Sequence, residues 1–187
     1  MIAIDFEASS LVDGYPVSIG IAASDGRMLY RLIKPHPEWE AMRWSPVSEQ
    51  IHGLSQEQLT ATGIEPARLM EELNEVFAGE TLVSDNPPFE WQWLQVLVEY
   101  AGPAHFSLST VSASEILTTT ASARSMPIPT LRAIERAISR MARHNALLDA
   151  TAWIAGHAAV DKWAPVTTEA EIDAVFDDWE ARAQACL

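Results

Sequence analysis

The fold is decided near the start of the chain, by the stretch Ile2-Ala3-Ile4-Asp5-Phe6-Glu7. Branched and aromatic side chains bounded by charge are typical of a short, largely buried strand, which predicts a strand over Ile2–Phe6. Two more apolar runs, Val17–Ala23 and Met28–Lys34, follow and are separated by the turn sequence Ser24-Asp25-Gly26. The three runs predict a β-meander, in which consecutive strands pair antiparallel.

Beyond this meander the pattern alternates between helical and extended segments. Pro66 suits a first helical turn, and the apolar residues after it recur at helical spacing. We expect further strands at Thr81–Ser84 and His105–Thr110, and further helices at Phe89–Tyr100, from Thr130, at Asn145–Ala159 and at Glu169–Ala183. This order predicts an α/β fold with a mixed sheet flanked by helices, which is a class and not a function.

The bulk composition limits the classes of protein to consider. The chain has 187 residues, of which 48% are hydrophobic, enough for one domain with a sizeable core. No apolar run reaches the roughly 18 residues that span a bilayer, and the first residues lack the basic segment of a signal peptide. The lone cysteine, Cys186, has no partner for an internal disulfide, which favours a reducing compartment. We therefore expect a cytoplasmic protein.

The charge of the chain is strongly negative and unevenly distributed. A net charge of −14 disfavours broad adhesion to nucleic acid, because phosphate binding usually depends on Lys and Arg. No Lys or Arg occurs between Leu69 and Ala123. Arginines then line one helical face, at Arg132, Arg136, Arg140 and Arg143. This stripe favours a protein that holds a short strand end, with Arg136 and Arg140 guiding the nucleic-acid backbone, although the alternative is ordinary helix solubility.

The first strand ends on two carboxylates that lie two residues apart, Asp5 and Glu7. Side chains alternate along a strand, so both acids point to the same side. Carboxylates a few ångströms apart repel unless a proton or a cation lies between them, and oxygen ligands suit Mg²⁺ and Mn²⁺. The pair is either part of a metal site or an acidic strand end that faces water.

A second acidic segment runs from a strand end into a helix start, as Ser84-Asp85-Asn86-Pro87-Pro88-Phe89-Glu90. Taken alone, Asp85 or Asn86 is a plausible helix cap, and Glu90 a first-turn acid that the helix dipole favours. In a functional interpretation, one of the two acids contributes a carboxylate to the same site as Asp5 and Glu7.

A third segment, His144-Asn145-Ala146-Leu147-Leu148-Asp149, places a histidine before a late helix and a carboxylate in its first turn. Histidine is the side chain best suited to move a proton near neutral pH, and Asp149 offers another oxygen ligand. The alternative for His144 is a purely structural residue at the start of a helix.

Taken together and in order, the three segments resemble the DEDDh 3′→5′ exonuclease superfamily, to which ribonuclease T, oligoribonuclease and the proofreading subunit of DNA polymerase III belong. The matching elements are Asp-x-Glu, Asn-x-x-Phe-acid and His-x-Ala-Leu-x-Asp-Ala, and Ile51-His52-Gly53-Leu54-Ser55 is a further point of likeness. The resemblance covers about residues 1 to 160. The chain departs from it at Glu90, where the family has Asp, and at Ser10, where many relatives have Gly.

The resemblance implies a ribonuclease-H-like fold with a mixed five-stranded sheet flanked by helices. It implies two divalent ions, Mg²⁺ or Mn²⁺, with His144 as general base. The metal ligands it implies are Asp5, Glu7, Asp149 and Glu90, with Asp85 as the competing acid for the position of Glu90. The residues it places at the terminal nucleotide are Ala8, Ser9, Leu11 and His52. The implied substrate is the 3′ end of single-stranded nucleic acid, RNA favoured over DNA, and the protein is a possible homodimer because relatives are often dimers.

The chain divides into an expected exonuclease domain, residues 1–165, and a C-terminal acidic helix, residues 166–187. An apolar stripe on that helix predicts that it packs on the same domain, with partner docking as the alternative. Some tryptophans either stack bases or fill the core: Trp39, Trp44, Trp91, Trp93 and Trp153. The rival functional interpretations are a non-catalytic scaffold with this fold, a phosphoesterase for small nucleotides, and a general interaction module.

Overall fold

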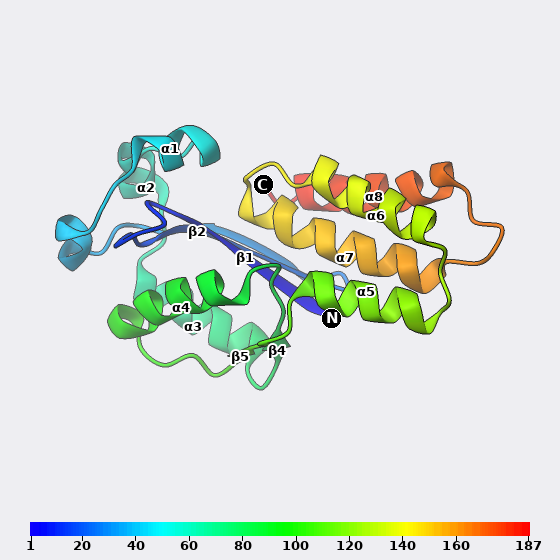
Figure 1. The fold of residues 1–187 in the computed structure, drawn as a ribbon. Coiled ribbons are helices and arrows are strands. Elements are labelled where there is room, and N and C mark those ends of the chain that lie inside the picture. The colour runs from blue at the N-terminus through cyan, green and yellow to red at the C-terminus, as the bar shows by residue number, and fades with distance from the viewer.

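Strands run through the middle of the molecule, with helices on both sides (Figure 1). The structure, a computed structural model, describes residues 1–187. Its strands are β1 (Ile2–Ala8), β2 (Pro16–Ala23), β3 (Met28–Leu32), β4 (Thr81–Leu82) and β5 (Ser107–Leu108). The antiparallel order β1-β2-β3 confirms the predicted meander.

The prediction of a single five-stranded sheet is wrong. The strands form a three-stranded antiparallel sheet and a separate two-stranded parallel sheet of β4 and β5. One parallel bridge, Ala3 to Val83, joins them, with the Ile4 amide donating to the Val83 carbonyl at 2.9 Å. β4 and β5 each contain two residues, and the chain continues from β4 through a turn into the helix that starts at Pro87.

Helices form two groups on opposite sides of the strands (Figure 1). The helices are α1 (Pro46–His52), α2 (Gln56–Thr62), α3 (Pro66–Phe77), α4 (Pro87–Ala101), α5 (Ala113–Ala123), α6 (Ile128–Met141), α7 (Ala146–Lys162) and α8 (Glu169–Gln184), with a short 3-10 helix η1 (Pro37–Ala41). Helices α3 and α4 pack on one face, and α7 packs on the other with α5, α6 and α8 around it. The spacing of Ser55 and Gln58 is typical of a capping box and marks the start of α2, where the Ser55 side chain accepts from the Gln58 amide. No sequence pattern was used to predict α1, α5 or η1.

The two faces of the meander differ in side-chain size, and this difference positions the site. Alternate residues of β1, such as Ile4 and Phe6, join the core under α3 and α4. The face toward α7 carries small or polar residues instead, including Ala3 on β1 and Ala22 on β2. Small side chains let α7 approach the sheet closely, and Asp5 lies on that same face because it is two residues from Ala3.

The C-terminal helix packs on the rest of the chain. One face of α8 is buried in the core that α6 and α7 share, through Ile172, Phe176, Trp179 and Ala183. Thr168 caps this helix in a reciprocal capping box with Glu171. None of the helices is long and apolar enough to cross a membrane.

Candidate metal centre

The first two acids of the site are held on β1, at the point where α7 comes closest to the sheet. Asp5 pairs with Gly20 of β2 across the ladder, and Glu7 pairs with Ser18. A Cβ atom at Gly20 would lie only 2.1 Å from the backbone of Ala146 at the start of α7. Glycine at this position therefore allows the first turn of α7 to lie against β2, beside both carboxylates.

The start of α7 is fixed by its own cap. The Asn145 side chain accepts hydrogen bonds from the amides of Leu147 and Leu148, each at 3.2 Å. His144, immediately before the cap, has a left-handed backbone with φ of 55°, which is unusual for a residue with a Cβ. The Arg143 amide donates to Asp149 Oδ1 at 2.8 Å, so the loop and the first turn of α7 are tied together.

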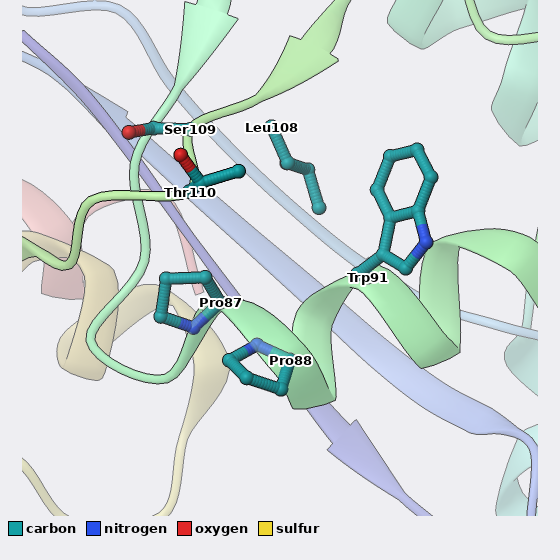
Figure 2. A pocket seen from close by; sticks show the side chains of 6 residues that line it. All are labelled: Pro87, Pro88, Trp91, Leu108, Ser109 and Thr110. Carbon is teal, nitrogen blue, oxygen red and sulfur yellow. The ribbon is translucent and has the colours of Figure 1, made fainter.

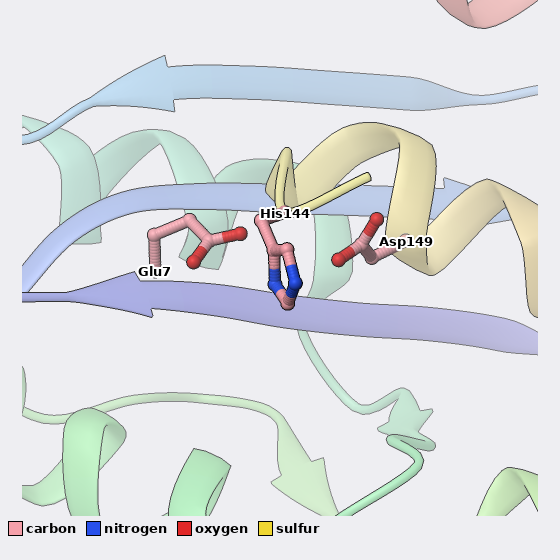
Figure 3. A group of neighbouring side chains, drawn as sticks. All are labelled: Glu7, His144 and Asp149. Carbon is pink, nitrogen blue, oxygen red and sulfur yellow. The ribbon is translucent and has the colours of Figure 1, made fainter. Parts of the chain in front are cut away.

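One cluster of ligand atoms joins β1 to this loop. Atoms of Glu7, His144 and Asp149 that are able to bind a metal lie within 4.8 Å of one another. Figure 3 shows the imidazole of His144 between the two carboxylates, above β1. Residues 137 positions apart in the sequence thus meet in one place, with a base beside two oxygen ligands.

A second cluster joins β1 to the turn before α4 and to the first turn of that helix. Carboxylate oxygens of Asp5, Asp85 and Glu90 lie within 4.8 Å of one another. The structure therefore brings both acids of the second segment to Asp5, whereas the sequence analysis had them compete for one position. Glu90 is only 4% exposed, and Asp85 is exposed on the turn before α4.

The acids of the two clusters influence one another's pKa values. Burial raises the pKa of Asp5 well above its ordinary value, and repulsion from Asp149, Glu7, Glu90 and Asp85 adds to the shift. The pKa of Glu7 rises to about 8, through burial and then repulsion from Asp149 and Glu90. The pKa of Glu90 rises to about 7, through burial and then repulsion from Asp85. Burial also raises the pKa of Asp85 and of Asp149.

These acids lack a basic side chain that would neutralise their charge. None of the five carboxylates takes part in an ion pair. One oxygen of Glu90 is buried without any hydrogen-bond partner, which is costly for a charged group. Carboxylate oxygens suit Mg²⁺ or Mn²⁺, and the imidazole beside them offers a base. The residues present therefore fit divalent cations.

A groove of about 410 Å³ opens beside Glu7 and His144. Three of the residues predicted at the terminal nucleotide line it: Ala8, Leu11 and His52. The fourth, Ser9, is fully buried below the groove, where its hydroxyl donates to the Arg43 carbonyl at 2.8 Å and accepts from the Tyr15 amide. Several other residues line the groove that were not predicted as substrate contacts, including Val12, Arg43, Val47 and Ile51.

His52 lines this groove as a half-buried side chain with a defined tautomer. Its Nδ1 accepts from the Leu54 amide at 3.0 Å, so the proton of the neutral ring lies on Nε2. That Nε2 is buried and has no partner within the chain. Burial lowers the pKa of His52, which keeps the ring neutral. Together with the 63% exposed side chain of Leu11, it gives the groove one polar and one apolar contact.

An apolar pocket of about 360 Å³ lies beyond Asp85 and Glu90. Trp91, which is 52% exposed, and Pro88 line it from the start of α4, and Leu108 lines it from β5 (Figure 2). Trp91 is the most accessible of the tryptophans considered for base stacking, whereas Trp39 and Trp93 are buried in the core.

The arginine stripe does not lie at the carboxylates. Arg136 pairs with Glu169 of α8 at 3.2 Å, and Arg140 pairs with Asp173 of the same helix. Neither residue lines the groove beside Glu7. The structure therefore places these two predicted substrate contacts in an ion-pair ladder between α6 and α8.

Comparison with known proteins identifies the fold. No family model matches the chain, and no curated protein is similar to it in sequence. Escherichia coli exonuclease I, solved with zinc and single-stranded DNA, is similar over 95% of this chain and 42% of its own, with a TM-score of 0.62 and 15% identity. Exonuclease I from Methylocaldum szegediense has the same coverage and TM-score at 16% identity. A 3′-exonuclease that recognises the histone mRNA stem-loop matches 86% of this chain and 63% of its own, with a TM-score of 0.54 and 13% identity.

The chain thus has the fold of 3′→5′ exonucleases, which confirms the resemblance seen in its motifs at the level of the fold. It spans less than half the length of the two exonuclease I chains.

Proposed function

We propose that this protein is a metal-dependent 3′→5′ exonuclease that hydrolyses phosphodiester bonds at the 3′ end of single-stranded nucleic acid. The observation that carries the proposal is the convergence of Glu7, His144 and Asp149 with Asp5 and Glu90 at one end of β1. The exonuclease fold of the chain and the two motif segments on β1 and α7 support the same conclusion. In a scaffold that binds no metal, a buried and unpaired acid such as Glu90 would only lower the stability of the fold.

The residues of the site have distinct roles in this proposal. The carboxylates of Asp5, Glu7, Glu90 and Asp149 hold two divalent ions, Mg²⁺ or Mn²⁺. When bound, these ions neutralise the acids and stabilise the charge that develops on the phosphate. His144, at the exposed edge of the cluster, accepts the proton of the attacking water. Its ring lies between the side chains of Glu7 and Asp149 (Figure 3).

The substrate strand crosses the carboxylates from one cavity to the other. The terminal nucleotide occupies the groove beside Glu7, where Leu11 packs on its base and His52 lines the wall. A nucleotide upstream of the scissile bond stacks on Trp91, because this neutral pocket suits a base and not a phosphate. The net charge of −14 is compatible with this path, because the bound cations provide the local positive field.

Several finer properties form part of the proposal. We expect a preference for RNA over DNA, which depends on how the groove contacts the 2′-hydroxyl. Residues 1–165 form the exonuclease domain, and residues 166–187 form a helix that buttresses it. A cytoplasmic location and a homodimer are also proposed.

The test of this function uses matched single-stranded RNA and DNA, labelled at either the 5′ or the 3′ end. With Mn²⁺, the 5′-labelled strand should shorten stepwise, and the 3′-labelled strand should release its label first as a mononucleotide. Chelation of the metal or the substitution Asp149→Asn should abolish both. A wild-type protein that binds Mn²⁺ but releases no nucleotide from any strand would contradict the proposal and favour the scaffold interpretation.

A further inference from the structure

The turn before α4 supplies the cluster with more acid than the motif resemblance requires. That resemblance predicts one carboxylate from this segment, and the chain brings two, Asp85 and Glu90, to the carboxylate of Asp5. The Ala113 amide donates to the Ser84 carbonyl at 2.7 Å and anchors the turn. Prolines 87 and 88 follow at the first turn of α4, where their restricted backbone limits other conformations. The position of Asp85 is therefore fixed on both sides.

The three acids differ in their exposure to solvent, so the site is closed at Glu90 and open at Asp85. Glu90 is 4% exposed and forms the floor, and one of its carboxylate oxygens has no partner. Asp5 is partly buried on β1, and Asp85 is exposed at the mouth. A cation that enters from solvent would meet Asp85 first and would then satisfy the unpartnered oxygen of Glu90. No basic side chain pairs with any of the three, so nothing in the chain replaces that cation.

We propose that Asp85 is a fifth acidic ligand of the metal centre and shares one divalent cation with Asp5 and Glu90. The proposal rests on the proposed metal-dependent function, but it concerns binding and can be tested without catalysis. An added carboxylate increases the negative charge around this cation, so the cation is held before the substrate arrives. Because all three side chains offer oxygen, the site takes a hard cation such as Mn²⁺ or Mg²⁺.

The experiment is a calorimetric Mn²⁺ titration of the full chain without nucleic acid. Wild type is compared with Asp85→Asn and Glu90→Gln, and with Asp177→Asn as a matched control on the exposed face of α8. The expected result is that Asp85→Asn and Glu90→Gln each weaken one Mn²⁺ site by about 10-fold or more, the size seen when groups around a metal are removed. Asp177→Asn should bind Mn²⁺ as wild type does.

The folding of Asp85→Asn provides a second measurement. The substitution removes a carboxylate that repels Glu90, so the melting temperature in chelator should equal or exceed that of wild type. Unchanged Mn²⁺ affinity in Asp85→Asn would overturn the inference while nucleotide release by wild type stood. If wild type bound no Mn²⁺ at all, the proposed function would fail together with the inference.

Discussion

The acids at the end of β1 and the acids of α8 are equally prominent in the sequence, but the structure treats them in opposite ways. On α8, Glu169 and Asp173 face arginines of α6 and form ion pairs with them. At the end of β1, Asp5 and Glu90 face other carboxylates and have no basic partner. Charge density alone therefore does not identify a metal site. A metal site is indicated by carboxylates that the fold brings together without a basic side chain to pair with them.

The largest effect should follow from removing Asp5, the acid that repels carboxylates of both clusters. We expect Asp5→Asn to lower nucleotide release by about 1,000-fold or more, because metal ions contribute several kcal/mol of transition-state stabilisation. Asp173→Asn on α8 makes the same chemical change outside the site and should leave the rate near that of wild type. Steady-state rates with Mn²⁺ measure both. Equal losses in the two variants would remove the distinction between the two acidic regions.

A somewhat smaller loss should follow from removing the base. His144→Ala should lower turnover by about 100-fold, within the range that general-base catalysis contributes. Mn²⁺ affinity, measured by titration, should change much less than the rate, because oxygen ligands remain in place. If the variant lost Mn²⁺ binding and kept its turnover per bound metal, His144 would be a ligand and not the base.

Removal of the aromatic face beside Asp85 should have a moderate effect. Stacking of one base contributes about 1–3 kcal/mol, so Trp91→Ala should lower kcat/KM on an oligonucleotide by about 10-fold. A 5′-p-nitrophenyl ester of a single nucleotide, which has no upstream base to stack, should be cleaved at the wild-type rate. Trp91→Phe should retain part of the effect. A uniform loss on both substrates would indicate that Trp91 acts only through the structure.

Metal removal should expose the unpaired acids as a stability defect. In chelator, protonated Glu7 and Glu90 favour the folded state, since their pKa values are raised from 4.5 to about 8 and about 7. Their stabilising contribution is complete below pH 4.5 and is lost as pH rises to about 8. The melting temperature should therefore fall between pH 5 and about 8 in chelator, and Mn²⁺ should prevent the fall. A melting temperature that rises over this interval without metal would contradict the account.

The smallest effect is expected at the arginine ladder. Arg136→Glu with Arg140→Glu should leave KM unchanged, because both side chains face α8 and not the groove. Stability should fall by about 1 kcal/mol or less per exposed pair lost, plus repulsion from the new acids. Oligonucleotide KM and urea unfolding measure the two quantities. A clear rise in KM would restore the role in backbone guidance that the helical spacing predicts.

Much of the fold follows from local patterns. Alternation predicted the meander and the shared face of Asp5 and Glu7, and helical spacing predicted α3, α4, α6, α7 and α8. The helices that were missed have local signals that were not used. Ser45 and Pro46 cap the start of α1, and Ser112 caps α5 by accepting from the Glu115 amide. The extents of β4 and β5 depend on tertiary pairing, and no local pattern sets them.

The candidate site was predicted less completely, for physical reasons. Motif order led to Asp5, Glu7, His144 and Asp149, and the structure brings these side chains together. The sequence could not show that Asp85 joins Glu90, because the direction of each side chain depends on the turn before α4. Nor could it show that Arg140 pairs with a residue 33 positions later. Such contacts arise only when distant segments pack, as Gly20 does against the start of α7.

Binding of divalent cations by the carboxylates at β1 can be tested by locating Mn²⁺ in crystals of the protein through its anomalous scattering. We expect anomalous density for Mn²⁺ among the carboxylates of Asp5, Glu7, Glu90 and Asp149, with a ligand from Asp85. No such density should lie along α8. Density confined to the acids of α8, or no density at saturating Mn²⁺, would contradict this expectation.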